Sequence, residues 1–107
     1  MPPRAASAPH HAVTVSTGVM QGHLVRPVQP VYPPLARSAH IQGAVVLGAV
    51  ISREGSVEGL HLESGHPMLV KAAMDAVRQW RYRPYLLNGL PVQVETQITV
   101  IFSLHDN

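Results

Sequence analysis

The sequence has no cysteine, few charged residues and no long hydrophobic run. Without cysteine, disulfide bonds and thiolate chemistry are excluded. Charged residues make up 13% of the 107 residues, and the eight Lys and Arg are scattered, which argues against a nucleic-acid partner. No apolar run reaches the roughly 18 residues that a membrane-spanning helix needs, and residues 1–13 lack the apolar region of a signal peptide.

What is present suits one small domain, because hydrophobic residues make up 46% of the chain. The six acidic residues suggest no buried carboxylate pair, and neither a Ser/His/Asp arrangement nor a glycine-rich phosphate loop can be argued, so we expect no enzyme. His10 and His11 are adjacent, and His61 and His66 are five apart. Zinc needs three or four convergent ligands, so we expect no metal and no other cofactor.

The clearest element is an amphipathic helix predicted over residues 67–84. Pro67 suits the first helical position, and Pro84 pushes Arg83 out of the α region, so we expect the helix to end near Pro84. Arg81 and Arg83 would then lie near its C-terminal end, where positive charge stabilises a helix, and we interpret them as capping or solvated residues in preference to an anion site. The apolar residues fall in one stripe roughly 140° wide. They are Leu69, Ala72, Ala73, Ala76, Val77 and Trp80.

Three strands are predicted around this helix. Residues 43–51 are apolar on both alternating faces, as in a central strand, and residues 57–63 return as its hairpin partner with a bulge near Glu58 and Gly59. Residues 92–104 follow an Asn-Gly turn and alternate apolar with polar. We expect an α+β fold with a three-stranded antiparallel sheet in the order 2-1-3 and the main helix on one face. The third strand would then be an edge, open to another strand.

The first part of the chain holds seven of the ten prolines within 34 residues. We interpret residues 1–24 as a linker or arm rich in Pro, Ala and His, followed by the folded domain over residues 25–107. The alternation of Val13 and Val15 leaves open a short strand or an ordered arm after residue 11.

Two short segments follow this arm. Residues 26–34 contain four prolines and favour an extended course, which excludes a central strand. Residues 34–39 predict a brief N-terminal helix that would dock through Leu35 and Ala39.

Five short motifs then occur in order, QPVYP at 29–33, IQG at 41–43, GSV at 55–57, SG at 64–65 and WRYRP at 80–84. A last strand carries Ile98, Val100 and Phe102. This succession resembles the C-terminal domain of TonB over about residues 25–104. The Asn-Gly turn and the long stretch before the last strand are more similar to divergent TonB-like proteins than to the enterobacterial ones.

The resemblance implies a periplasmic domain, tethered to the inner membrane by an N-terminal transmembrane helix that is absent from this sequence. It would couple the proton motive force, through ExbB and ExbD, to uptake of siderophores, cobalamin or sugars by outer-membrane TonB-dependent receptors. The receptor's TonB box would join the third strand by β-strand addition. The residues expected to bind this peptide are Gln29, Tyr32, Gln97, Ile98, Thr99, Val100, Ile101, Phe102, Ser103 and Leu104.

Alternatives remain open for two residues and for the whole domain. Tyr32 fits a structural role, in which it holds the arm against the domain, better than it fits a receptor contact. For Gln29, a role in receptor binding and the absence of any such role are equally open. A sensory or assembly module of the same fold, attached to another membrane protein such as an antibiotic-sensing peptidase, is the second hypothesis. Such a module could form a homodimer through the same edge strand, which the oligomeric state would test.

Overall fold

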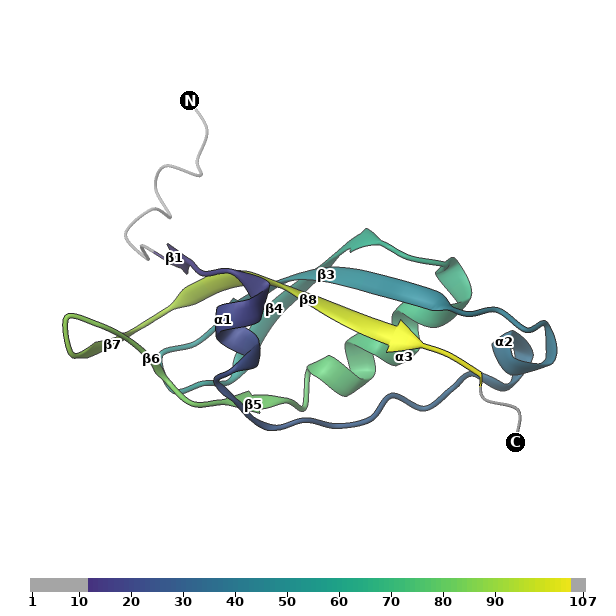
Figure 1. Cartoon of the computed structure of the whole chain (residues 1–107), viewed down its shortest axis with the longest axis horizontal. Helices are drawn as coiled ribbons and strands as arrows, with labels where there is room; N and C mark the ends of the chain where they lie inside the picture. The colour runs from purple at the N-terminus through teal and green to yellow at the C-terminus, as the bar shows by residue number, and fades with distance from the viewer. Residues whose placement is uncertain (1–11, 105–107) are drawn as a thin grey trace, which may run out of the picture.

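The computed structural model describes residues 12–104, in which three long strands and one main helix are joined by shorter elements (Figure 1). The strands are β1 (Val13–Thr14), β2 (Leu24–Arg26), β3 (Gly43–Ile51), β4 (Val57–Ser64), β5 (Arg81–Tyr82), β6 (Tyr85–Leu87), β7 (Leu90–Val92) and β8 (Val94–Phe102). The helices are α1 (Thr17–Gln21), α2 (Pro34–Ser38) and α3 (Pro67–Val77).

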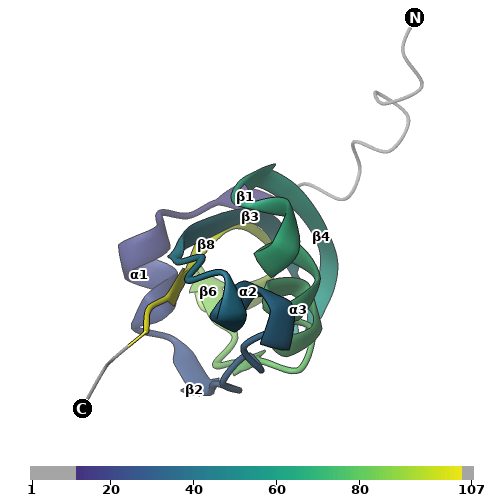
Figure 2. The same ribbon diagram turned by 90° about the vertical axis from the view of Figure 1, so that its right-hand side faces the viewer.

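The main sheet has the strand order β1-β8-β3-β4. β3 is central, and it pairs antiparallel with β8 along its whole length, with Val45 opposite Val100. Its pairing with β4 shifts register between Val50 and Ile51, so the bulge predicted near Glu58 and Gly59 is confirmed. Figure 2 looks along the strands and shows a curved sheet with α2 and α3 inside the curve.

The prediction of a three-stranded, wholly antiparallel sheet is wrong, because β1 adds a fourth strand. Val13 and Thr14 pair in parallel with Val94 and Glu95 at the start of β8. An alternating pattern this short carries too little information to identify a partner strand. β8 is consequently an edge strand over only part of its length.

The start of α3 follows the sequence prediction. Pro67 opens the helix, and His66 caps it because its Nδ1 accepts a hydrogen bond from the N–H of Met68 at 3.0 Å. One stripe of the helix is buried against the sheet. The buried residues are Leu69, Ala73, Ala76 and Val77.

The end of α3 differs from the prediction, since the helix stops at Val77 rather than near Pro84. Arg78 and Gln79 form a turn, and the chain then extends into β5, where Tyr82 lies opposite Leu24 of β2. Pairing with β2 requires extended backbone, and this tertiary interaction overrides the local helical pattern. Trp80 is half-buried against the core, and its indole Nε1 donates a hydrogen bond to the carbonyl of Val28 at 2.9 Å.

The predicted strand over residues 92–104 is in fact two strands. β6 and β7 form a separate hairpin, closed by Asn88 and Gly89 with φ of 53° and 82°, as the Asn-Gly turn predicts. The chain crosses from this hairpin to the main sheet at Gln93. In β8 the even-numbered residues from Val94 to Phe102 are buried and the odd-numbered ones are exposed.

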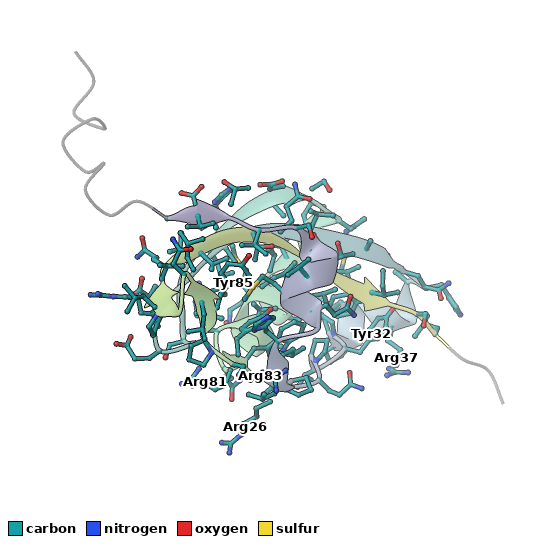
Figure 3. The ribbon with its side chains drawn as sticks, turned by 60° about the vertical axis from the view of Figure 1, so that its left-hand side comes forward. Arg26, Tyr32, Arg37, Arg81, Arg83 and Tyr85 are labelled. Atoms are coloured by element: carbon teal, nitrogen blue, oxygen red, sulfur yellow. The ribbon has the colours of Figure 1, made fainter. Side chains whose placement is uncertain are left out.

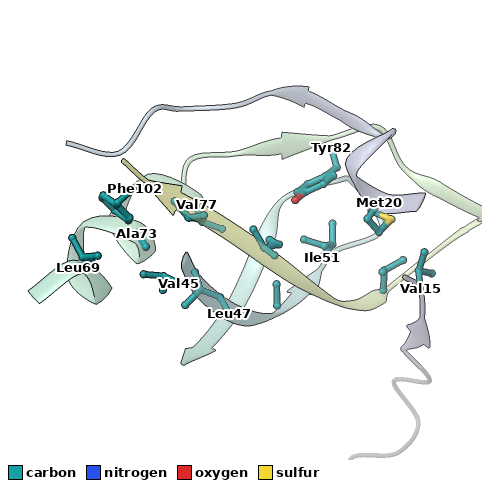
Figure 4. Packing of buried hydrophobic residues seen from close by; sticks show 14 of the residues in the cluster. Val15, Met20, Val45, Leu47, Ile51, Leu69, Ala73, Val77, Tyr82 and Phe102 are labelled. Atoms are coloured by element: carbon teal, nitrogen blue, oxygen red, sulfur yellow. The ribbon is translucent and has the colours of Figure 1, made fainter. Parts of the chain in front are cut away.

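One hydrophobic core lies between the concave face of the sheet, α3 and the N-terminal elements (Figure 4). α2 contributes Ala36, which is fully buried, whereas Leu35 is 72% exposed and Ala39 is also exposed. The predicted docking through Leu35 and Ala39 is therefore wrong. A helix of five residues can present only one side to the core, and here that side carries Ala36.

Candidate functional site

The first half of the outer edge of β8 is occupied by residues 13–21 of the same chain, which we call the N-terminal cover (Figure 1). The N–H of Val13 donates to the carbonyl of Gln93 at 2.8 Å, and the N–H of Val15 donates to the carbonyl of Glu95 at 2.9 Å. The next outward carbonyl belongs to Gln97 and accepts from Thr17 Oγ1 at 3.0 Å. Thr17 is the first residue of α1, so from here the N-terminal cover no longer forms a strand beside β8, although α1 still packs against it.

The second half of this edge has no partner strand among residues 12–104. Odd-numbered residues of β8 turn their carbonyls outward, as the contacts of the N-terminal cover demonstrate, so the backbone groups of Thr99 and Ile101 also face away from β3. We call the outward backbone of these two residues the open edge. Beyond it the strand is held by the N–H of Leu104, which donates to Gln42 Oε1 at 2.7 Å.

The open edge is uncharged and partly apolar. Ile101 is 64% exposed, and no charged side chain occurs between Thr96 and Leu104. Unpaired N–H and C=O groups on an uncharged strand can add a further strand through main-chain hydrogen bonds. The chemistry that this surface offers is recognition of an extended peptide backbone.

The predicted residues of β8 have different surroundings. Ile98, Val100 and Phe102 are buried in the core, and Ser103 is exposed. The side chain of Gln97 crosses the outer face of the sheet and donates to Glu63 Oε1 at 2.6 Å. Only Thr99 and Ile101 of the predicted set combine exposed side chains with outward, unpaired backbone in the described residues.

Tyr32 lies beneath the C-terminal end of β8. Its ring meets that of Phe102 edge to face with centroids 5.4 Å apart, and the guanidinium of Arg37 lies 5.0 Å from its centroid (Figure 3). The hydroxyl donates a hydrogen bond to the carbonyl of Ile41. These contacts fasten the extended arm to the end of the sheet.

Gln29 lies elsewhere, in a cleft between the arm and α3 whose lining includes Ala72 and Asp75 and none of residues 97–104. The structure therefore does not bring Gln29 together with the open edge. A hydrogen bond from Lys71 holds the pKa of the Asp75 carboxyl below its usual value. This cleft consequently carries an exposed ion pair on its α3 side.

Sequence analysis missed the N-terminal cover as part of this site. One local signal was present, because Ser16 precedes α1 and its Oγ accepts a hydrogen bond from the N–H of Val19 at 3.3 Å. Met20 of α1 is only 2% exposed and fixes the cover to the core. The pairing of the cover with β8 depends on contacts across some 80 positions, which no local pattern reveals.

No cluster of three or more His, Cys, Asp or Glu side chains that could hold a metal is found within residues 12–104. His10 and His11 lie outside the described residues. Arg81 donates from Nη1 to the carbonyl of Trp80 at 2.8 Å, and Arg83 donates from Nη2 to the carbonyl of Gly22 at 3.2 Å. Arg83 thus ties the β5 region to the N-terminal segment rather than to the end of α3.

Comparison with known proteins points to one family. The family described as Gram-negative bacterial TonB protein C-terminal matches residues 28–104. Protein TonB of Vibrio cholerae is 34% identical over 79 residues, which are 72% of this chain and 32% of that protein. Protein TonB of Xanthomonas campestris pv. campestris is 35% identical over 78 residues, which are 71% of this chain and 35% of that protein. The chain thus spans about a third of the length of these curated relatives.

Solved structures show the same fold. The TonB C-terminal domain of Pseudomonas aeruginosa superposes with a TM-score of 0.66 at 23% identity, covering 78% of this chain and 87% of that one. The TonB2 protein of Vibrio anguillarum gives a TM-score of 0.59 at 27% identity, covering 78% of this chain and 85% of that one. Within residues 12–104, no helix is long and apolar enough to span a membrane.

Proposed function

Because the chain belongs to the family of Gram-negative bacterial TonB C-terminal domains, we propose that it transmits energy to outer-membrane TonB-dependent receptors by binding their TonB box. The parent protein works in the periplasm, is tethered to the inner membrane by an N-terminal helix, and draws on the proton motive force through ExbB and ExbD. The receptors take up siderophores or other nutrients.

The observation that carries this proposal is the open edge of β8. Thr99 and Ile101 present backbone donors and acceptors on a regular, uncharged strand, and no described residue pairs with them. β-Strand addition uses such groups for affinity and alternate side chains for specificity. On this account the receptor peptide pairs with residues 99–101, because the N-terminal cover fills the edge up to Gln97.

The proposal is tested with fluorescent ten-residue peptides copied from the N-terminal plug segments of TonB-dependent receptors of the same genome. For a peptide that binds, each amide is methylated in turn, which removes one backbone donor without changing a side chain. N-methylation at alternate positions should weaken binding by about tenfold or more, with little effect at the positions between. An equal effect at successive positions, or no binding by any peptide, contradicts strand addition.

A second candidate is a sensory or assembly module that pairs through the same edge. It is favoured by the exposure of Ile101 beside unpaired backbone, since two such edges can meet about a twofold axis. Sedimentation at increasing concentration separates the candidates. A stable dimer at micromolar concentration that resists displacement by receptor peptides favours assembly, and a monomer favours the receptor role.

A further inference from the structure

A cleft of about 240 Å³ opens beside the open edge, between α1, β2, β5 and β8. Thr99 and Ile101 of the open edge border it, and the residues that line it from the inner side include Met20, Gln21, Leu24, Trp80, Tyr82 and Ile98. Four of the lining residues, Thr17, Met20, Gln21 and Leu24, precede residue 28, where the family match begins. The cleft is therefore built in part by a segment outside the region that this chain shares with the family.

The cleft is lined by apolar and uncharged polar residues, and its apolar walls are fixed. Met20 is 2% and Tyr82 is 4% exposed, and these two residues lie at the same end of the core in Figure 4. Trp80 is held by the hydrogen bond from its indole to Val28. No charged residue lines the cleft, so a charged group that entered it would lose water without gaining a partner.

The cleft lies where a side chain of a strand added to β8 would point. Residues of a neighbouring strand that lie beside Ile98 and Val100 point to the inner face of the sheet, as those two side chains do. Residues beside Thr99 and Ile101 point to the outer face instead. A peptide that pairs with β8 just beyond α1 would thus direct its first inward-facing side chain into the cleft.

The N-terminal cover already shows that this edge of β8 pairs with an extended backbone and that an inward side chain is buried there. Val15 pairs through its N–H with Glu95, and its side chain is 7% exposed. A peptide placed next along the same edge continues this arrangement. The cleft is the next inward position, and its volume is large enough for one apolar side chain.

We propose that this cleft is a selectivity pocket for one apolar side chain of leucine or isoleucine size on the bound peptide. The inference rests on the proposed function, because it requires a peptide on the open edge. The further claim is that residues 20–24, in addition to the region that matches the family (residues 28–104), determine which peptide side chain the cleft accepts.

The test uses the receptor-plug peptide that binds most tightly in fluorescence anisotropy, with each position changed in turn to Ala and to Asp. At one inward position the change of a Leu or Ile to Ala should weaken binding by about tenfold, and Asp should abolish it. The two neighbouring outward positions should change affinity by less than about twofold. This scan uses the unaltered protein, so it does not depend on the folding of a variant.

A double-mutant cycle then connects that position to the cleft. In Leu24→Ala protein, the penalty for Ala at the inward peptide position should fall from about tenfold to about threefold or less, because the wall that the side chain contacts is gone. Leu35→Ala is the matched control, since Leu35 is 72% exposed on α2 and does not line the cleft. It should leave the penalty unchanged.

The outcomes are distinct. Tight binding that is indifferent to every inward side chain, or a penalty that Leu24→Ala and Leu35→Ala affect equally, overturns the pocket while leaving strand addition intact. No binding by any peptide to folded, monomeric protein overturns the proposed function, and the pocket with it.

Discussion

The two long strands that flank β3, namely β4 and β8, have contrasting edges. β4 has two register shifts against β3, and it carries Glu58, Gly59 and Glu63. β8 pairs with β3 in continuous register and has no charged residue from Thr96 onward within the strand. Bulges and charges on an edge discourage further pairing, whereas a regular uncharged edge invites it.

The two strands thus differ in how their exposed edges are protected from pairing with another strand. β4 is protected by its own irregularity, while β8 is protected by the N-terminal cover over its first half only. The protection ends at Gln97, where the predicted peptide site begins. On the proposed function, the regular and uncovered half of β8 is the part that pairs with the receptor peptide.

The largest expected effect comes from proline at the open edge. Ile101→Pro removes an outward N–H while sparing the groups that face β3, so receptor-peptide binding should fall by at least about a hundredfold. Leu62→Pro places the same ring in β4 and should leave peptide affinity within about twofold. Anisotropy titrations of both variants, with thermal unfolding to confirm the fold, check the contrast. Equal losses in the two variants would contradict a special role for β8.

Loosening the N-terminal cover should make the two halves of β8 more alike. Met20→Ala removes a buried anchor of α1 and should lower the free energy of unfolding by about 2–4 kcal/mol. Hydrogen exchange at the N–H groups of Val13 and Val15 should accelerate, while that of the β3–β4 amides should change less. Unchanged exchange at Val13 and Val15 would mean that α1 does not hold the cover in place.

High pH should lower the stability of the domain through Tyr82 of β5, whose side chain lines the cleft beside β8. Burial raises the pKa of the Tyr82 phenol from 10.0 to about 12, so the neutral form contributes stability that is complete below pH 10. This contribution is lost as the pH rises from 10 toward 12, by up to about 2 kcal/mol. Denaturant unfolding between pH 9 and 11.5 should show the loss in the native protein and a smaller one in Tyr82→Phe. Parallel curves for the two proteins would contradict this assignment.

The smallest effect is expected away from both edges, at the exposed ion pair of α3. Lys71 lowers the pKa of Asp75, so the contribution of this carboxylate is present above its ordinary value of 3.8 and disappears as the pH falls through its lower folded value. Asp75→Asn should leave peptide affinity unchanged and alter thermal stability only slightly at pH 7. A clear loss of peptide binding would instead assign a role to the Gln29 cleft.

Local patterns in the sequence predicted the elements that local interactions define. The apolar run of residues 43–51 gave the central strand, Pro67 gave the start of α3, and Asn88 with Gly89 gave the turn before the last strand. Each of these features depends on backbone preferences or on one periodic face, both of which can be read within about ten residues.

The features that the sequence did not reveal depend on distant partners. Helix α3 ends early because β5 pairs with β2, and the first half of β8 is covered because Val13 and Val15 reach it from the start of the chain. Gln29 was placed near the peptide site by family resemblance alone, and it lines another cleft. The alternation of β8 predicted the strand but not how much of its edge is available.

The most direct test is an amide-shift titration of the ¹⁵N-labelled domain with unlabelled receptor-plug peptides. We predict saturable shifts at Thr99 and Ile101, with much smaller shifts at Leu60 and Leu62 of β4 and at Gln29. Shifts confined to β4 or to the Gln29 cleft, or no shift in a monomeric sample, would contradict the claim that the open edge of β8 is the receptor site.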